Sequence, residues 1–282
     1  MKRIYGSGDF EGVSYRLDET PEGPVLLTRV SEKSWGPNYV RFGLAMSYDF
    51  NGPASFDFNA SHRATWMNAW GGEWRNDLQF GRTDRLRTEW YQPLSPAQRF
   101  FTSTWLDLAR RPFELFEDGD ALASFRRVST VGSLDVGLPL GSAGEFRAGV
   151  QRGTVRLSNS GGLPLGSLLG PPSDLAGVSM RLRLDTLDSL SFPRHGQAAE
   201  VEYYRSLSEW GATDDYDKFS AAWRSAWSWG NHTVRAAAEV ATANKANQLP
   251  VYELYSLGGF LRLSGYRTGE FVGRELAFGR LI

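Results

Sequence analysis

Apolar and polar side chains alternate along most of this chain, from residue 39 to the end. In the stretch 39–50, Phe42, Leu44 and Met46 fall on one side of an extended chain, and Arg41 and Ser47 fall on the other. A period of two is typical of β-strands, because successive side chains of a strand point to opposite sides. The pattern therefore predicts an all-β protein whose strands have one apolar and one polar face.

The number and spacing of the alternating segments favour a barrel. Strands of a soluble sandwich recur about every 8–12 residues, and a propeller repeats a signature about every 40–50 residues. Here each strand with its loop takes roughly 20 residues, and no signature repeats. The 12 segments are 39–50, 56–65, 74–80, 85–94, 98–110, 121–140, 145–151, 178–185, 197–208, 216–229, 231–243 and 271–282, with a long loop expected at 158–176.

The chemistry of the two faces favours a membrane barrel over a soluble one. The polar face carries Arg, Asp and Glu on strand after strand, which a water-filled lumen accepts. Aromatic residues make up 13% of the chain, and many lie near strand ends, as in the girdles at membrane interfaces. These are Trp66, Trp70, Trp74, Trp90, Tyr91, Trp210 and Trp229. We expect a transmembrane antiparallel β-barrel, with a soluble all-β protein as the alternative.

The composition excludes several classes of protein. Without Cys the chain has no disulfide, zinc–thiolate site or iron–sulfur cluster. A net charge of −1 argues against a globally basic nucleic-acid-binding protein. No apolar run approaches the roughly 18 residues of a spanning helix, and no apolar signal segment follows Met1. We therefore expect either a cytoplasmic protein or a natural N-terminus that lies upstream.

Residues 1–38 follow a different pattern. Two short strands, 13–18 and 25–30, flank a turn at 19–23 that contains Pro and Gly. This predicts a hairpin at the end of a small periplasmic-type domain. Residues 34–37, Ser-Trp-Gly-Pro, are the expected hinge to the barrel.

Three motifs carry a resemblance to a known family. The stretch from Gly8 to Tyr15 resembles the closing hairpin of a polypeptide-transport-associated (POTRA) domain. A second motif resembles the periplasmic turn of the bacterial surface-antigen barrel, and consists of Asp185, Asp188, Pro193 and Gly196. A third resembles the extracellular loop that folds back into the lumen in the outer-membrane assembly-factor superfamily, and consists of Gly258, Gly259, Arg262, Ser264, Gly265 and Tyr266.

In this order the motifs are most similar to the C-terminal region of outer-membrane patatin-like phospholipases, which join a lipase domain, one POTRA domain and a surface-antigen barrel. The resemblance implies that residues 1–36 end a POTRA domain and that 37–282 form the barrel, in the outer membrane of a Gram-negative bacterium. The family barrel has about sixteen strands, in line with bacterial barrels. The 12 segments found therefore imply a truncated, open barrel that does not close alone.

The fold-back motif departs from the family pattern at one position. The superfamily motif usually reads Val-Arg-Gly followed by an aromatic residue, and its Arg docks on acidic residues inside the barrel. Ser264 occupies the Arg position, while Arg262 and Arg267 are out of phase with it. A Ser cannot supply a bidentate charged clamp, which argues against an insertion or translocation mechanism that relies on one. The glycines and Tyr266 can still plug the lumen.

No catalytic or metal-binding motif is present. The patatin reaction uses a Ser in a Gly-x-Ser-x-Gly elbow with an Asp partner. Ser142 and Ser160 come nearest, but neither has Gly two residues before it. The scattered residues His62, His195 and His232 lack the spacing of a metal site. We expect a non-catalytic segment without cofactor or metal, whose parent protein carries a Ser-Asp dyad upstream.

The charged residues of the turn and lumen each allow two interpretations. Asp185 and Asp188 could form a carboxylate pair for acid–base chemistry, but a hydrogen-bonded acidic turn is favoured. The inward-facing arginines are expected to pair with lumen acids, and could also bind anionic lipid headgroups. They are Arg41, Arg63, Arg75, Arg87, Arg147, Arg181, Arg183, Arg224 and Arg235.

The expected function is a barrel that anchors, exports or displays a patatin-like lipase. The implied partners are outer-membrane lipids, a covalently linked patatin domain, the outer-membrane assembly machinery and a second copy of the chain, with no nucleic acid. The first alternative is a protein-assembly or two-partner-secretion pore of the same superfamily. The second is a soluble all-β binding protein.

Overall fold

Strands make up most of the protein. The computed structural model describes residues 10–21, 23–32, 38–47, 55–117, 119–162, 170–189, 191–244 and 249–282. Within them the only helices are two short 3₁₀ turns, η2 (Ser208–Trp210) and η4 (Val251–Glu253). No helix in this part of the chain is long and apolar enough to cross a membrane. The predicted all-β fold is confirmed.

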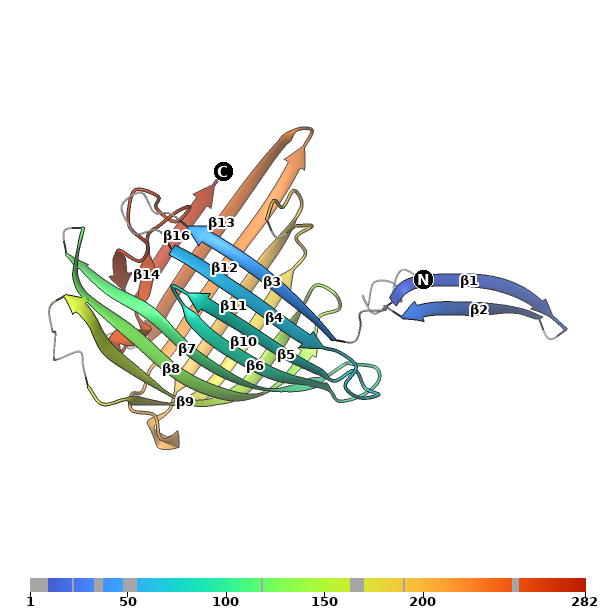
Figure 1. Ribbon diagram of the computed structural model, residues 1–282, viewed down its shortest axis with the longest axis horizontal. Coiled ribbons are helices and arrows are strands. Elements are labelled where there is room, and N and C mark those ends of the chain that lie inside the picture. The colour runs from blue at the N-terminus through green and yellow to red at the C-terminus, as the bar shows by residue number, and fades with distance from the viewer. Residues whose placement is uncertain are drawn as a thin grey trace.

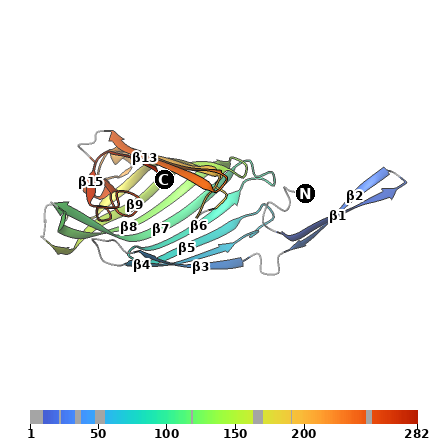
Figure 2. The ribbon, with the colours of Figure 1, turned by 90° about the horizontal axis from the view of Figure 1, so that it is seen from above.

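Twelve strands form one antiparallel sheet, and most of them pair with the next strand along the chain. In chain order they are β3 (Asn38–Ser47), β4 (Ser55–Ala64), β5 (Glu73–Gly81), β6 (Asp84–Pro93), β7 (Phe101–Glu117), β8 (Asp120–Pro139), β9 (Gly144–Gly162), β10 (Ser173–Asp185), β11 (Gly196–Ser206), β12 (Asp217–Trp229), β13 (His232–Asn244) and β16 (Leu276–Leu281). The sheet curls around a concave side but stays open, since β3 and β16 are its two edges (Figures 1 and 2).

Two hairpins lie outside this sheet. Strands β1 (Phe10–Thr20) and β2 (Gly23–Glu32) pair with each other, and both are longer than the sequence indicated. The expected hinge at 34–37 and the first residues of the POTRA-like motif lie outside the described residues. Strands β14 (Tyr255–Leu257) and β15 (Phe271–Gly273) form the second hairpin, between β13 and β16.

Three predicted boundaries are wrong. The segment expected at 98–110 ends later, because β7 continues to Glu117 in pairing with β8. The expected loop 158–176 is shorter, because β9 continues to Gly162, opposite Ala123 of β8, and β10 already begins at Ser173. The polar, glycine-containing end of β9 hides its strand character, which comes from backbone pairing with β8. The expected single strand 271–282 is two strands, because β15 pairs with β14 whereas β16 pairs with β13.

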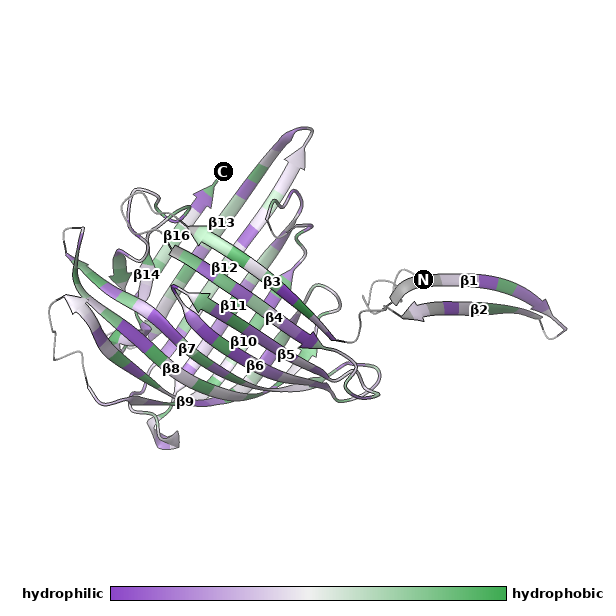
Figure 3. Ribbon diagram, in the orientation of Figure 1, coloured by the Kyte–Doolittle hydropathy of each residue, from purple (hydrophilic) through white to green (hydrophobic). Residues whose placement is uncertain are grey.

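The two faces of the sheet differ as the alternation predicts. Large apolar side chains cover the convex face and are exposed, for example Leu44 at 69% and Leu134 at 55%. Charged side chains lie on the concave face, where Asp107 and Arg147 are buried. Figure 3 shows the resulting alternation of hydrophobic and hydrophilic residues along the strands. Among the described residues, most buried side chains of the sheet therefore lie on the concave side.

Candidate functional site

The concave face holds networks of paired charges rather than an apolar core. Glu89 of β6 accepts hydrogen bonds from Arg147 Nη1 of β9 at 2.6 Å and from Ser103 Oγ of β7 at 2.7 Å. Arg147 Nε also donates to Glu145 at 2.7 Å. Glu89, Ser103 and Arg147 are all buried. A buried charge is tolerated only when it is paired and hydrogen-bonded, and this network meets that condition.

A second network lies further along the same strands. Asp107 of β7 accepts a hydrogen bond from Arg85 Nη2 at 2.5 Å and forms an ion pair with Arg87 Nη1 at 3.6 Å. The Arg87 guanidinium stacks over the Trp105 ring, 4.2 Å from its centroid. Trp105 Nε1 in turn donates to Asp135 of β8 at 2.7 Å. Two arginines therefore share one carboxylate here.

The third network ties the segment after β13 to the concave face. Glu253 of η4 accepts a hydrogen bond from Arg127 Nη2 of β8 at 2.8 Å and pairs with Lys218 of β12. Burial disfavours the charged carboxylate, but Lys218 and Arg127 outweigh it and hold the pKa of Glu253 below its usual range. Glu253 thus links two strands that are not neighbours in the sheet.

A small apolar cluster supports the same segment. Leu249 is buried with Tyr204 of β11, Tyr216 and Ala243 of β13, and Tyr255 packs against them. The residues that precede and follow Glu253 are therefore packed against the concave face, in addition to the ion pairs that Glu253 makes.

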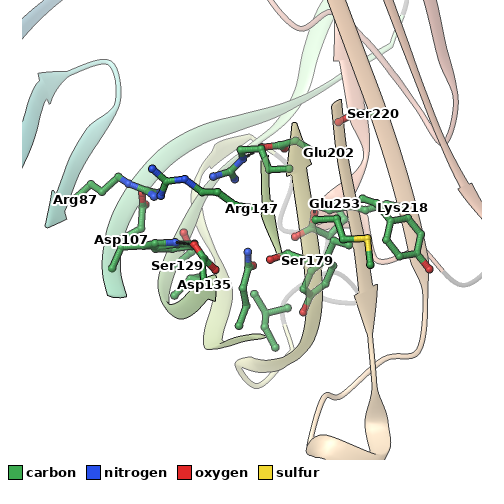
Figure 4. A pocket seen from close by; sticks show the side chains of 18 of the residues that line it. Arg87, Asp107, Ser129, Asp135, Arg147, Ser179, Glu202, Lys218, Ser220 and Glu253 are labelled. Carbon is green, nitrogen blue, oxygen red and sulfur yellow. Dashed lines mark hydrogen bonds and ion pairs between the residues drawn. The ribbon is translucent and has the colours of Figure 1, made fainter. Parts of the chain in front are cut away.

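A cavity of about 400 Å³ opens between these networks. Figure 4 shows Arg87, Asp107 and Arg147 on one side of it, with Lys218 and Glu253 on the other. Most of its lining is polar or charged, which suits water or a polar ligand better than an apolar one.

Two of the three glycines in the fold-back motif, Gly258 and Gly259, are required by its backbone, whereas a Cβ at Gly265 would meet open space. Gly258 has φ +131°, and a Cβ there would lie 2.3 Å from the carbonyl oxygen of Arg267. Gly259 has φ +97°, and its N–H donates to the carbonyl of Tyr266 at 3.1 Å. The Tyr266 ring meets Phe271 of β15 edge to face at 4.7 Å. The motif is therefore a compact loop closed on the β14–β15 hairpin.

The loop contacts the sheet through Arg262, which the sequence places out of phase with the superfamily arginine. Arg262 Nη2 donates to Glu239 Oε2 of β13 at 2.5 Å. Ser264 Oγ instead accepts the N–H of Leu261 at 3.1 Å, within the loop. Leu261 and Leu263 both have positive φ, at +62° and +89°. Counting residues along a regular strand cannot describe such a backbone, so the inference that Arg262 is out of phase missed this ion pair.

The turn between β10 and β11 is held by the acidic residues of its motif. Asp188 Oδ1 accepts the backbone N–H of Arg194 at 2.9 Å and of His195 at 3.2 Å. These bonds lower the pKa of Asp188, the Arg194 N–H contributing most. Asp185 Oδ1 accepts the N–H of Leu187 at 3.0 Å. Both carboxylates are thus used to order the turn, which gives no support to acid–base chemistry.

The last residue of the turn motif is a glycine for a steric reason. Gly196 has φ +101°, and a Cβ there would lie 2.1 Å from the carbonyl oxygen of Thr186. Pro193 lies just before the residues whose N–H groups bind Asp188. In the described part of the chain, no three His, Asp or Glu side chains gather as metal ligands.

Fold and site together define an antiparallel barrel-type sheet with a charged concave face and a loop docked inside it. The Omp85 superfamily domain matches residues 71–280, most of the chain. This chain therefore belongs to the Omp85 superfamily of outer-membrane β-barrel proteins. The superfamily expected from the motifs is confirmed, while the POTRA remnant and the patatin link stay predictions.

The comparison with solved structures agrees on the fold. Among 66 matching chains is the crystal structure of BamA from Haemophilus ducreyi lacking POTRA domains 1–3, with a TM-score of 0.69 and 15% sequence identity. The match covers 95% of this chain and 53% of the BamA chain, so this chain spans about half the length of that one. At this identity the likeness shows the fold alone. No curated protein sequence is significantly similar to this chain.

Proposed function

We propose that this chain is the membrane-embedded barrel region of a Gram-negative outer-membrane protein, and that it anchors a patatin-like lipase domain without catalysing a reaction itself. The observation that carries the membrane part is the opposite polarity of the two faces. Side chains such as Phe42, Leu44 and Met46 expose 69–80% of their surface on the convex face. A soluble protein rarely exposes so large a continuous apolar surface, whereas lipid covers it at no cost.

The lipase part of the proposal rests on the order of the motifs. A hairpin that resembles the end of a POTRA domain precedes the barrel, as in patatin-like phospholipases of the outer membrane. In that arrangement the barrel holds the enzyme at the membrane. The genomic sequence upstream tests this directly. A Gly-x-Ser-x-Gly α/β domain followed by a single POTRA domain is the expected result, and a string of POTRA domains without a lipase would contradict it.

The membrane location has its own test. After expression at a low level and cell fractionation, we expect the chain in the outer-membrane fraction. High salt should not extract it, and detergent should release it. Recovery in the soluble fraction would favour a soluble all-β binding protein instead.

One observation favours a second function, a protein-assembly or secretion pore of the same superfamily. The ion pair between Arg262 and Glu239 gives the loop a charged attachment to β13, although Ser264 occupies the position of the superfamily arginine. The fold is also similar to that of BamA. An assembly factor should restore the insertion of other barrel proteins in cells depleted of their own factor, whereas a lipase anchor should not.

A further inference from the structure

Three arginines on neighbouring strands meet at the wall of the central cavity. Arg85 of β6, Arg111 of β7 and Arg127 of β8 all line it. Arg111 and Arg127 are directly opposite each other in the β7–β8 register. Arg85 is opposite Ala109, two residues from Arg111 on the same face. Like charges directly opposite each other in a sheet are destabilising, so this arrangement needs a compensating anion.

The carboxylates of the cavity do not supply enough negative charge. Asp107 is shared by Arg85 and Arg87, and Glu253 is shared by Arg127 and Lys218. Asp135 also lines the cavity, but its oxygens accept hydrogen bonds from Trp105 and Ser133. The lining also holds Arg147, which pairs with Glu89 and Glu145, and Arg181, which pairs with Glu202. Apart from these, five cationic side chains face three carboxylates, which leaves a surplus of two positive charges. The five cations are Arg85, Arg87, Arg111, Arg127 and Lys218, and the three carboxylates are Asp107, Asp135 and Glu253.

Donor groups in this cluster also remain unused. Among the described residues, no hydrogen bond or ion pair is formed by the Arg111 guanidinium, although it lines the cavity. Arg127 Nε is buried and, within the same part of the chain, has no hydrogen-bond partner. A buried donor without a partner costs about 1–3 kcal/mol in a folded protein. The buried Nε of Arg127 therefore marks the place of a hydrogen-bond acceptor. Arg111 is exposed, and its guanidinium is free to bind the same acceptor.

We propose that Arg85, Arg111 and Arg127 bind a phosphate group in this cavity. A guanidinium presents a planar fork of donors that matches phosphate oxygens. Arg111 offers its whole fork, and Arg127 offers its unpaired Nε. Arg85 adds its positive charge and its Nη1 group, because its Nε and Nη2 donate to Asp107. Donors from three strands suit a tetrahedral group with several free oxygens better than a carboxylate, which has only two. A phosphate monoester carries a charge of about −1.5 to −2 near neutral pH, which balances the surplus. The phosphate belongs either to a free anion or to a lipid headgroup.

The test measures phosphate binding to the full chain refolded in detergent micelles, by titration calorimetry. The probes are inorganic phosphate, a short-chain phosphatidic acid and the phosphatidylcholine of the same chain length. We expect Arg111→Gln to weaken phosphate binding about tenfold or more, because a hydrogen bond to a charged group is lost. Arg111→Lys keeps the charge but loses the fork, so it should weaken binding less. If Arg111→Gln fails to fold, Arg85→Gln serves in its place, because Arg87 still pairs with Asp107.

Arg183→Gln is the matched control. Arg183 lies on β10, on the same concave face of the sheet as the three arginines of the site. It pairs with Glu200 at 3.0 Å and is not part of the cavity lining. Its substitution should leave the affinity unchanged. Binding of both phosphate and phosphatidic acid, or of either one alone, supports the site and identifies the source of the phosphate group.

Three results would overturn the proposal. The first is the absence of binding of either phosphate probe by the unmodified chain. The second is an equal loss of affinity in Arg111→Gln and Arg183→Gln, which would mean that overall charge attracts the anion. The third is displacement of phosphate by acetate or by an acidic peptide at equal concentration, which would show that the cluster selects charge and not the phosphate group.

Discussion

Leu44 and Ala45 are neighbours in β3 and belong to opposite faces of the sheet. Leu44 shares the convex apolar face, and Ala45 is opposite Asp57 of β4 on the concave side. We predict that Leu44→Arg destabilises the protein in lipid by about 2–4 kcal/mol, the cost of a cation on the lipid face of a barrel. Ala45→Arg should be tolerated, because Asp57 can pair with it. Urea unfolding in lipid vesicles measures both, and equal costs would contradict the assignment of faces.

Glu253 is the residue whose loss should most weaken the docked segment. We predict that Glu253→Gln lowers the free energy of unfolding by about 1–3 kcal/mol, since Arg127 and Lys218 lose their shared carboxylate. Both cations are partly exposed, which keeps the cost below that of a fully buried charge. Exposed Glu209 in η2 provides the control substitution Glu209→Gln. Urea unfolding measures the free energy, and protease sensitivity of residues 249–257 reports on the docked segment. Identical values in both variants would refute the link.

At the scale of elements, the turn between β10 and β11 should respond to acid. Its Asp188 has a lowered pKa in the folded protein, because the N–H groups of Arg194 and His195 bind the charged form. Asp188 therefore stabilises the turn fully above the usual pKa of an Asp. This stabilisation is lost as the pH falls through the lower pKa of the folded state. The protection factors of the turn amides in hydrogen exchange, which correct for the intrinsic slowing of exchange by acid, should fall on acidification. Asp188→Asn should remove this pH dependence.

The attachment of the fold-back loop can be tested by exchanging charges. Arg262→Glu places two acids together and should release the loop from β13, which raises the protease sensitivity of residues 258–270. Combining it with Glu239→Arg restores the ion pair with the two charges exchanged. The double variant should recover much of the resistance of the loop to protease. If the double variant is as sensitive as the single one, the ion pair does not hold the loop.

The strand faces could be predicted from the sequence, but the contacts of the loop could not. Alternation alone places Leu44 outside and Asp107 inside, because side-chain direction in a strand follows local periodicity. Glu253 and Arg127 are 126 residues apart, and no local pattern relates them. Arg262 reaches Glu239 through a backbone with positive φ at Leu261 and Leu263. The end of β9 was missed because pairing with β8, and not its own composition, makes it a strand.

The whole molecule is an open barrel wall, with an apolar convex side suited to lipid and a charged concave side suited to water. The two edges β3 and β16 carry unpaired backbone groups in the described sheet. Such edges are costly in lipid, so further strands or a second copy of the chain should cover them in the membrane. The phosphate site proposed above lies on the wet side and does not depend on how the edges are covered.

Because the chain contains no Cys, single-cysteine scanning can show without background which side of the sheet faces lipid. Neighbouring residues are replaced by Cys one at a time in protein reconstituted into lipid vesicles, at the pairs Leu44 and Ala45, Leu78 and Gln79, and Val150 and Gln151. We predict that the second member of each pair reacts with a water-soluble maleimide. A fluorophore on the first member should instead be quenched by a lipid-phase quencher. Equal reaction of both members with the water-soluble reagent would contradict a membrane-spanning sheet.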